Sequence, residues 1–377
     1  MAITFKDIEK IKGLTEHFEL VKGRIDIIES FGGGRINKTY KITIRGEDGK
    51  RYEYLLQRVN NYVFEDTKGL MNNIVSATNF VRENGGQSLE YIRCHQNSEA
   101  EEKNGMYIYV DAEKNTWRMY HYIDADVYPC IFNPHHAYML GEAIAEFSGS
   151  LDGFDATKLV ETIPDFHNTP KRFLALLHSI ARAVVAGSDR CQTASDAIGF
   201  VLEREEKLSV LTSALEKGDI LCRVVHNDPK LNNVLFAKDT GKPICMIDLD
   251  TIMPGTCLYD VGDALRSICN TASEDDKTTE NVSFSVEIFE EFVKGYLAGM
   301  KGKLVEKEIE LIPYSVWVLA MELGIRFLKD HVDGDVYFGT EYAGQNLERA
   351  NVQFALAKCI EEKLESNELQ EIVAKLK

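Results

Sequence analysis

The sequence has no closely spaced pair of cysteines. Its eight cysteines are spread over 377 residues, and no two are closer than twelve positions. Neither a zinc site of the C-x-x-C type nor a disulfide framework is therefore expected, and the thiols are predicted to stay reduced. Reduced thiols are typical of the cytoplasm, so the sequence predicts a cytoplasmic protein.

Long apolar runs are missing as well. The most apolar stretch, residues 312–325, contains Glu322 and is followed by Arg326, which makes it too short and too charged to span a bilayer. The N-terminal residues lack the basic segment and apolar stretch of a signal peptide. The sequence therefore predicts a protein that does not enter a membrane.

Basic residues are scarce beside acidic ones. The chain has 43 lysines and arginines against 60 aspartates and glutamates, a formal net charge of -17. This balance argues against nucleic acid or an anionic membrane as a main partner and leaves room for a local phosphate pocket. The sequence shows no repeat or low-complexity tract, and its 44% hydrophobic and 27% charged residues are ordinary for a globular protein. A monomer or a dimer is expected.

The first 125 residues favour β-strands. Apolar and polar residues partly alternate there, as they do in half-buried strands. Residues 66–84 instead have helical spacing, with Asp66 as the expected N-cap and Gly85 and Gly86 at the end. The predicted strands are residues 24–29, 39–44, 52–59, 105–110 and 117–123.

The rest of the chain is mainly helical in pattern. A strand-rich stretch over residues 221–249 interrupts a series of helix-spaced segments. The change of character near residues 122–126 predicts two domains, residues 1–123 and 124–377. The predicted helices are residues 134–149, 170–186, 195–217, 283–301, 306–330 and 346–376.

The strand-rich stretch carries the residues best suited to chemistry. His226, Asp228 and Asn233 form the pattern H-x-D-x-x-x-x-N, and Asp248 and Asp250 follow on a second short strand. Phosphoryl transfer uses such parts: one aspartate accepts the proton of a substrate hydroxyl, while an asparagine and a strand-borne aspartate hold Mg²⁺ against the nucleotide phosphates.

Each of these parts alone has an ordinary structural interpretation. His226 could be a core histidine, Asp228 a turn cap, and the glycines 32–34 a simple turn. Their order is more informative, because a glycine turn between the first two strands, a hinge, the catalytic-loop pattern and a metal aspartate follow one another as they do in kinases. The sequence contains no G-x-S-x-G elbow, which argues against a hydrolase.

Longer stretches resemble the aminoglycoside phosphotransferase and choline kinase superfamily, and within it the N-acetylhexosamine 1-kinases. The resemblance implies an α+β, protein-kinase-like fold with two lobes: a small antiparallel sheet with one helix, then a larger, mostly helical lobe. It further implies that ATP and Mg²⁺ serve to phosphorylate the anomeric hydroxyl of N-acetylglucosamine or N-acetylgalactosamine. The matching stretches are residues 34–40, 226–233, 247–255, 258–266, 321–328 and 334–338.

The resemblance also implies roles for single residues. Asp228 matches the catalytic base, Asn233 and Asp248 match Mg²⁺ ligands, and Asp250 matches a second acid that either binds the metal or orients the site. Arg326 and Tyr337 match residues that contact the sugar. The phosphate-covering turn is matched by Gly32, Gly33, Gly34, Ile36 and Asn37, and the adenine-binding hinge by Tyr120 and Tyr122.

Three features depart from the pattern. Arg35 stands where the N-acetylhexosamine kinases carry a histidine near the sugar, so it is predicted to contact substrate or to be a solvent-facing charge. Gln57 and Arg58 lie on the strand where protein kinases place a phosphate-binding lysine, and either contacts phosphate or is a plain strand residue. The helix over residues 66–84 has no acid before Glu83 to pair with such a lysine.

Two alternatives stay open at this point. The chain could be another small-molecule kinase of the superfamily, acting on a different sugar, a polyol, an aminoglycoside or an amino alcohol. It could also be a kinase-shaped binding protein without activity, although the presence of Asp228, Asn233 and Asp248 together argues against this.

Overall fold

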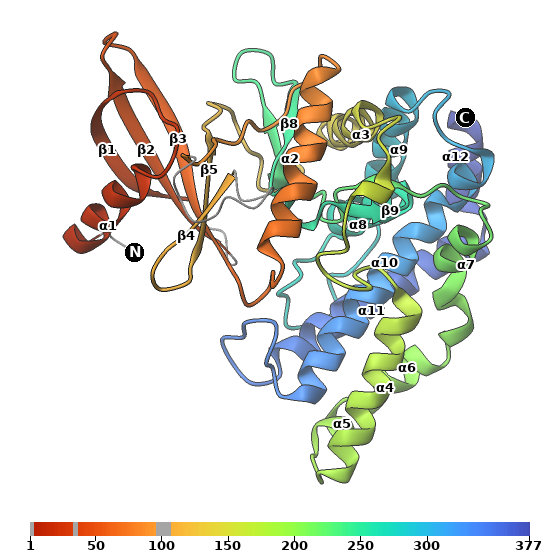
Figure 1. Ribbon diagram of the computed structural model, residues 1–377. Coiled ribbons are helices and arrows are strands. Elements are labelled where there is room, and N and C mark those ends of the chain that lie inside the picture. The colour runs from red at the N-terminus through yellow and green to blue at the C-terminus, as the bar shows by residue number, and fades with distance from the viewer. Residues whose placement is uncertain (1–3, 33–36, 96–106) are drawn as a thin grey trace. The chain divides into compact units, whose positions relative to one another are not determined.

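The computed structural model describes residues 4–32, 37–95 and 107–377, and the chain forms two compact units (Figure 1). The sequence analysis placed one boundary near residue 123. In the structure, two short later segments also belong to the first unit. The first unit comprises Met1–Asp126, Thr157–Ile163 and Leu249–Met253, and the second comprises Val127–Ala156, Pro164–Asp248 and Pro254–Lys377.

The first unit is built on a five-stranded antiparallel sheet with the strand order β1-β2-β3-β5-β4. Successive side chains of a strand point to opposite faces, and Ile42, Leu56 and Met119 are fully buried on the core side. This confirms the predicted small antiparallel sheet. The strands are β1 (Gly23–Phe31), β2 (Lys38–Gly46), β3 (Arg51–Val59), β4 (Ile108–Val110) and β5 (Thr116–His121).

Among its described residues, this unit has two α-helices. α1 (Phe5–Thr15), which the sequence analysis did not predict, contributes Ile11 and Leu14 to the apolar core beneath the sheet. α2 (Thr67–Glu83) begins after Asp66, whose Oδ1 accepts a hydrogen bond from the Gly69 N–H at 2.8 Å. The predicted N-cap is therefore confirmed.

The second unit is mostly helical, as predicted. Between α7 and α8 lie short strands, of which β7 and β8 form an antiparallel pair. The helices are α3 (Pro134–Ser150), α4 (Thr169–Val185), α5 (Arg190–Thr193), α6 (Ser195–Leu202), α7 (Val210–Glu216), α8 (Cys257–Cys269), α9 (Val286–Gly299), α10 (Glu306–Asp333), α11 (Gln345–Glu365) and α12 (Glu368–Leu376). The short strands are β6 (Arg223–Val225), β7 (Val234–Phe236), β8 (Pro243–Met246) and β9 (Met253–Gly255).

The centre of the second unit is α10, which packs against α4, α8 and α11. Its 28 residues are long and apolar enough to cross a membrane by length and composition alone. However, 83% of its most apolar window is buried inside the protein. Such burial is what a core helix requires. The helix extends beyond the apolar stretch of residues 312–325 at both ends, so the sequence analysis underestimated its length.

A pair of glycines lets α3 and α9 approach closely. A Cβ atom on Gly141 of α3 would lie 2.2 Å from the Phe292 carbonyl oxygen, and one on Gly295 of α9 would lie 2.2 Å from the Tyr138 carbonyl oxygen. Both distances are impossible for a real side chain. Glycine at these two positions therefore fixes the spacing of the helices.

Two predicted helices are each divided in the structure. Within residues 195–217, α6 ends near Arg204, whose guanidinium donates to the Phe200 carbonyl at 3.0 Å and satisfies the end of the helix. Within residues 346–376, Asn367 separates α11 from α12 and has a φ of 60°. Asparagine tolerates this left-handed conformation better than most residues.

Candidate active site

The loop that carries Asp228 lies between β6 and β7 in the second unit. The His226 ring is fully buried, and its Nε2 lies 2.8 Å from the Ile247 carbonyl oxygen. Its Nδ1 accepts a hydrogen bond from the Asp228 N–H at 3.3 Å. Since Nδ1 accepts, Nε2 carries the proton and donates to Ile247. His226 thus connects the backbone of Asp228 to the strand that leads to Asp248.

The predicted metal ligands Asn233 and Asp248 are linked to this loop through the backbone. The Ile247 N–H donates to the Asn233 carbonyl at 2.8 Å, and the Asn233 side-chain amide donates to the Asp228 carbonyl at 2.9 Å. Asp248 is exposed and has a φ of 59°. The structure therefore connects all three residues of the kinase pattern in one network of the second unit.

Lys230 lies beside the predicted base, and the sequence analysis did not select it. Its Nζ is 2.8 Å from Asp228 Oδ1, and the two side chains are 47% and 29% exposed. Burial of Lys230 opposes its positive charge, yet the carboxylates of Asp228 and Asp263 outweigh this and raise the pKa of the amine. The lysine is therefore charged at neutral pH. The sequence could have indicated Lys230, because it lies two residues after Asp228.

Asp260 of α8 holds the loop from behind. Its two carboxylate oxygens accept the backbone N–H groups of His226 at 2.9 Å and of Asn227 at 2.7 Å. Burial raises the pKa of this carboxyl, and the hydrogen bonds and His226 oppose the rise. Asp260 lies within residues 258–266, one of the stretches that carry the resemblance. Thr256 caps the N-terminus of α8, so the Asp260 side chain holds the loop and not the helix end.

A buried histidine was missed by the sequence analysis. His167 precedes α4, and its Nε2 lies 3.2 Å from the Asn227 carbonyl oxygen, directly before Asp228. Its Nδ1 lies 2.8 Å from Glu322 Oε1 on α10. No spacing signal in the sequence marks this pair, because 155 positions separate the two residues.

The two residues predicted to contact the sugar are in the second unit. The Arg326 guanidinium lies 5.0 Å from the centre of the Phe166 ring and 5.5 Å from that of Phe338. Tyr337 is 53% exposed, and its backbone N–H donates to Asp330 Oδ1 at 2.8 Å. Asp330 therefore holds the loop that carries Tyr337, and the sequence analysis did not select Asp330.

Asp250 belongs to the first unit, where it lies in a short 3-10 turn (Leu249–Thr251) and not on the predicted strand, and it makes a buried ion pair. Its Oδ1 lies 2.5 Å from the Arg118 guanidinium, and its Oδ2 accepts from the Asn37 amide at 2.6 Å. Arg118 is 2% exposed. Burial opposes the charge of Arg118, but Asp250 outweighs it and raises the pKa of the guanidinium. This geometry suits an orienting residue, and the metal-binding role of Asp250 stays a prediction.

Gln57 belongs to the same network. Its carbonyl oxygen accepts from Arg118 Nε at 2.9 Å, and its amide donates to the Thr39 hydroxyl at 3.0 Å. The side chain is therefore bonded within the sheet at both ends. Arg58, the neighbouring candidate for phosphate contact, is half-buried on β3.

The remaining predicted nucleotide residues are only partly described. Gly32 has a φ of 71°, and nothing lies within 4 Å of where its Cβ would be. Gly33, Gly34, Arg35 and Ile36 lie outside the described residues. At the predicted hinge, the Tyr120 ring packs 5.1 Å from that of Tyr91, and the Tyr122 N–H donates to the Glu53 carbonyl at 3.0 Å.

The donor set can be tested against the predicted Mg²⁺. Within residues 4–32, 37–95 and 107–377, no group of three or more His, Cys, Asp or Glu side chains gathers as a metal site. Mg²⁺ in kinase sites needs fewer protein ligands, because waters and substrate phosphates complete its octahedral shell. An exposed Asp248 linked to Asn233 fits that requirement.

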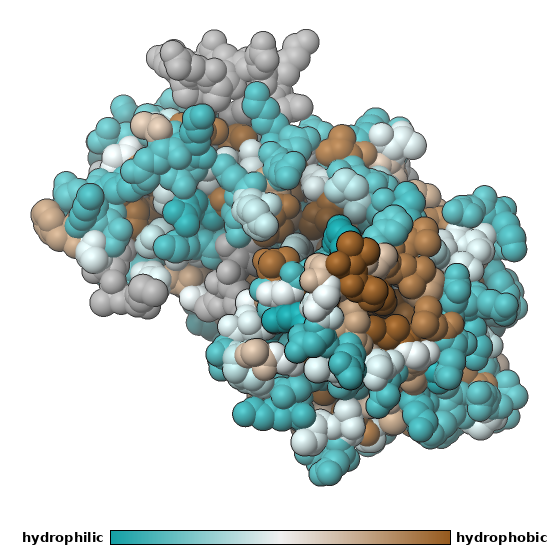
Figure 2. Space-filling view, turned by 90° about the horizontal axis from the view of Figure 1, so that it is seen from below, coloured by the Kyte–Doolittle hydropathy of each residue, from teal (hydrophilic) through white to brown (hydrophobic). Residues whose placement is uncertain are grey.

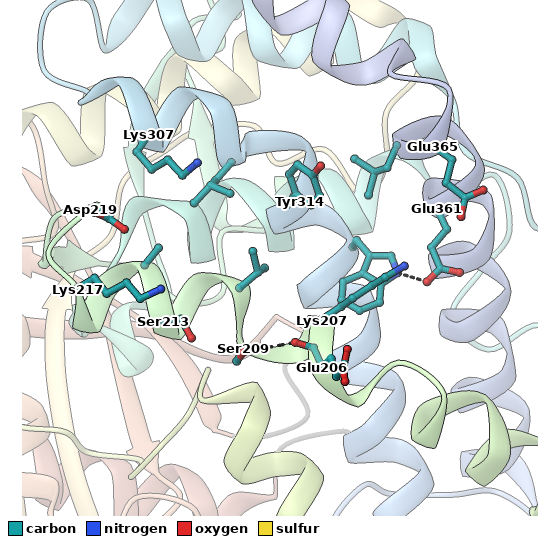
Figure 3. A pocket seen from close by; sticks show the side chains of 15 residues that line it. Glu206, Lys207, Ser209, Ser213, Lys217, Asp219, Lys307, Tyr314, Glu361 and Glu365 are labelled. Atoms are coloured by element: carbon teal, nitrogen blue, oxygen red, sulfur yellow. Dashed lines mark hydrogen bonds between the residues drawn. The ribbon is translucent and has the colours of Figure 1, made fainter.

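Two surface features lie apart from the predicted site residues. A pocket of about 650 Å³ between α7, α10 and α11 has apolar walls that include Trp317, whose indole donates to Glu361 at 3.1 Å (Figure 3). Its rim carries both lysines and acids, so charge selects no ligand class. Apolar side chains also gather on the face shown in Figure 2, and exposed ones on α4 are Leu174, Val184 and Val185.

A sheet unit, a helical unit and the loop pattern around Asp228 define a kinase-like phosphotransferase. Residues 27–300 match the phosphotransferase enzyme family known as APH. The chain therefore belongs to this family.

Solved structures share the fold. A choline kinase from Cryptosporidium parvum Iowa II has a TM-score of 0.60 and 15% identity, with 98% of this chain and 99% of that chain covered. Amicoumacin kinase in complex with AMP-PNP, Ca²⁺ and Ami has a TM-score of 0.60, 12% identity, and coverage of 94% and 96%. Spectinomycin phosphotransferase in complex with ADP and spectinomycin has a TM-score of 0.53, 15% identity, and coverage of 100% and 98%. The likeness confirms the predicted α+β, kinase-like fold.

Proposed function

We propose that this protein is an ATP- and Mg²⁺-dependent kinase that phosphorylates the anomeric hydroxyl of N-acetylglucosamine or N-acetylgalactosamine. The observation that supports kinase activity most directly is the network that joins Asp228, Asn233 and Asp248 through His226 and Ile247. The resemblance of the flanking sequence to N-acetylhexosamine 1-kinases supports the choice of substrate.

In this mechanism the chain mainly positions groups and places charges. Asp228 accepts the proton of the substrate hydroxyl, and Lys230 keeps positive charge 2.8 Å from its carboxylate. Asn233 and Asp248 would hold Mg²⁺, which when bound neutralises charge on the nucleotide phosphates. Asp260 keeps the backbone of the loop in place while the proton moves. Positioning of this kind supplies a large part of the barrier reduction in phosphoryl transfer.

The surroundings of Arg326 support a substrate without positive charge. Arg326 stands against the rings of Phe166 and Phe338. Burial lowers the pKa of the Arg172 guanidinium, and the positive charge of the neighbouring Arg326 lowers it further. Two neighbouring arginines would repel choline or an aminoglycoside. They would donate hydrogen bonds to sugar hydroxyls and to the carbonyl of an N-acetyl group.

A screen of acceptors tests the proposed substrate class. ATP consumption would be measured with N-acetylglucosamine, N-acetylgalactosamine, glucose, galactose, choline and kanamycin. We expect the two N-acetylhexosamines to give the highest kcat/KM. Preferred turnover of choline or kanamycin would instead establish one of the alternative small-molecule kinases of the family.

The methyl glycoside of N-acetylglucosamine tests which hydroxyl reacts. It keeps the ring and the N-acetyl group but has no free hydroxyl at C1, so we expect it to bind weakly and never to be phosphorylated. A 6-deoxy analogue keeps the C1 hydroxyl and should remain a substrate. The product formed from N-acetylglucosamine itself should show its phosphorus coupled to H1 in NMR. Phosphorylation of the methyl glycoside would contradict attack from C1 and leave a sugar kinase of another regiochemistry.

A further inference from the structure

His167 is placed with both ring nitrogens facing hydrogen-bond acceptors. Nδ1 lies 2.8 Å from Glu322 Oε1, and Nε2 lies 3.2 Å from the Asn227 carbonyl oxygen. The side chains of His167 and Glu322 are only 5% and 1% exposed. A neutral imidazole carries one N–H, so it can donate to only one of these two oxygens. A backbone carbonyl cannot donate in return.

The second oxygen of Glu322 is also surrounded as an acceptor. Glu322 Oε2 lies 3.0 Å from the Thr169 hydroxyl, which donates to it. Both carboxylate oxygens of Glu322 thus face a neighbouring polar group, and the His167 ring can donate to both of its own neighbours only as an imidazolium. A buried charge is stable when it is paired and hydrogen-bonded in this way.

The Asn227 carbonyl is a sensitive place for such a contact. Asn227 has a φ of 64°, and its N–H is held by Asp260 at 2.7 Å. His167 holds the carbonyl of the same residue, and the next residue in the chain is Asp228. The peptide unit that leads into the predicted base is thus fixed through Asn227 on both sides.

We propose that His167 is a positioning residue that is protonated at neutral pH, paired with Glu322, and holds the Asn227 carbonyl so that Asp228 is correctly oriented. The proposal rests on the proposed kinase function for its effect on turnover. The protonation state itself can be measured without any substrate.

The charges around His167 favour the protonated ring. Burial opposes the charge, but Glu322 and next Asp263 outweigh it, so the pKa of His167 is raised; Arg326 acts in the opposite direction. From the loop that carries Asp228, the Asn227 carbonyl oxygen faces the ring at 3.2 Å. The titratable or charged groups that face the ring are Glu322 and Arg326 from α10, and Tyr259, Asp260 and Asp263 from α8.

The pH dependence follows from the sign of this shift. Below the ordinary pKa of histidine the ring is charged in the folded and unfolded chain alike, and its full contribution is present. As the pH rises through the raised pKa of the folded protein, the ring loses one N–H and one of its two hydrogen bonds. Turnover should therefore fall on the alkaline side.

The first test reads the ring directly. The full chain, labelled with ¹⁵N-histidine, would be titrated by NMR from about pH 6 to about pH 10, with the His167 signals assigned by their loss in His167→Gln. We expect both ring nitrogens to have imidazolium shifts at neutral pH. A neutral ring with the proton fixed on Nε2 at neutral pH would overturn the proposal.

The second test measures turnover with the acceptor that the screen identifies. His167→Gln should lower kcat by about 10-fold or more while the KM for MgATP changes less than about 2-fold, and the alkaline fall of kcat that coincides with the His167 titration should disappear. His178→Gln, an exposed histidine on α4, is the matched control and should behave as the wild type. Unchanged kcat in His167→Gln would exclude the positioning role.

A second variant covers the case in which His167→Gln does not fold. Glu322→Gln keeps the size of the side chain but removes the negative charge that favours the imidazolium, so the NMR titration of His167 should move to lower pH. An unchanged titration would overturn the pairing. If no acceptor in the screen is phosphorylated, the proposed function fails, while the NMR titration still decides the state of the ring.

Discussion

Asp228 gains its position from neighbours that bind the backbone around it. His226, Asp260 and His167 all contact main-chain groups of residues 226–228, while Lys230 contacts the carboxylate itself. Backbone contacts of this kind fix the direction of a side chain without competing for its oxygens. The Asp228 carboxylate contacts Lys230 at 2.8 Å and is 29% exposed, which suits the proposed contact with a substrate hydroxyl.

The role of Asp228 can be tested by Asp228→Asn. The amide keeps the shape of the side chain but cannot accept the proton of the hydroxyl, so we expect kcat to fall by about 10² or more with an unchanged far-ultraviolet circular dichroism spectrum. Asp152→Asn, at an exposed turn of the same unit, is the control. Turnover near the wild-type value in Asp228→Asn would remove this residue from the mechanism.

For Asp250 we predict an effect on the free energy of unfolding. Asp250→Asn leaves the buried Arg118 guanidinium without its carboxylate, and breaking a buried pair by removing one partner costs about 3–5 kcal/mol. Urea unfolding followed by tryptophan fluorescence measures this, because Trp117 is buried on β5 beside Arg118.

Glu53→Gln is the matched control for Asp250→Asn. Glu53 pairs with Lys41 at 2.9 Å in the same sheet, but its side chain is 36% exposed. Surface pairs contribute about 0–1 kcal/mol, so this variant should change stability little. If Asp250→Asn were as stable as the wild type and lost MgATP affinity, Asp250 would be a metal ligand and the ion pair incidental.

Hydrophobic periodicity predicted the helices and strands well where one face of a segment is buried. The strands around Ile42 and Leu56, the helix capped by Asp66 and the long helix α10 all follow from alternating or helical spacing. The helix ends at Arg204 and Asn367 did not, because a guanidinium that caps a carbonyl and a left-handed asparagine leave the apolar spacing intact.

The candidate site was predictable only in its local part. The pattern from His226 to Asn233 is contiguous, so its spacing could be read from the sequence. The partners behind it come from elsewhere: Glu322 contacts His167 across 155 positions, and Arg118 contacts Asp250 from β5. Sequence spacing carries no information on which distant side chains meet in the fold.

The packing of α8 on α10 links helix geometry to the loop. A Cβ on Gly262 of α8 would lie 2.6 Å from the Ser315 carbonyl oxygen of α10, and α8 also carries Asp260. Gly262→Ala should therefore force the helices apart, destabilise the protein by about 1–3 kcal/mol in urea unfolding, and lower kcat.

Gly199→Ala is the control for this prediction. Gly199 lies inside α6, and nothing is within 4 Å of its Cβ position. Alanine there should stabilise the protein by up to about 1 kcal/mol, because it favours the helix without a clash. Equal stability of the two variants would show that the close approach of α8 and α10 has no energetic consequence.

The division into two units affects how ligand binding can be measured by unfolding. The chain leaves the second unit at Asp248 and enters the first at Leu249. A protein with two compact units need not unfold in one step, so each free energy of unfolding refers to the transition of the unit that holds the substituted residue. Ligand binding is better followed through the melting transition that MgATP shifts.

MgATP should raise the melting temperature of the wild type but not of Asp248→Asn. A ligand that binds only the folded state at about 100 times its Kd stabilises that state by about 2.7 kcal/mol, which shifts a transition of this size by a few degrees. Asp248→Asn removes a predicted Mg²⁺ ligand and keeps the shape of the side chain, and its shift is measured against its own unliganded melting temperature. Asp239→Asn, an exposed aspartate in the turn between β7 and β8, should keep the full shift.

The wild type with ATP and excess EDTA should behave as Asp248→Asn does with MgATP. A full MgATP shift in Asp248→Asn would show that the metal is held by other residues.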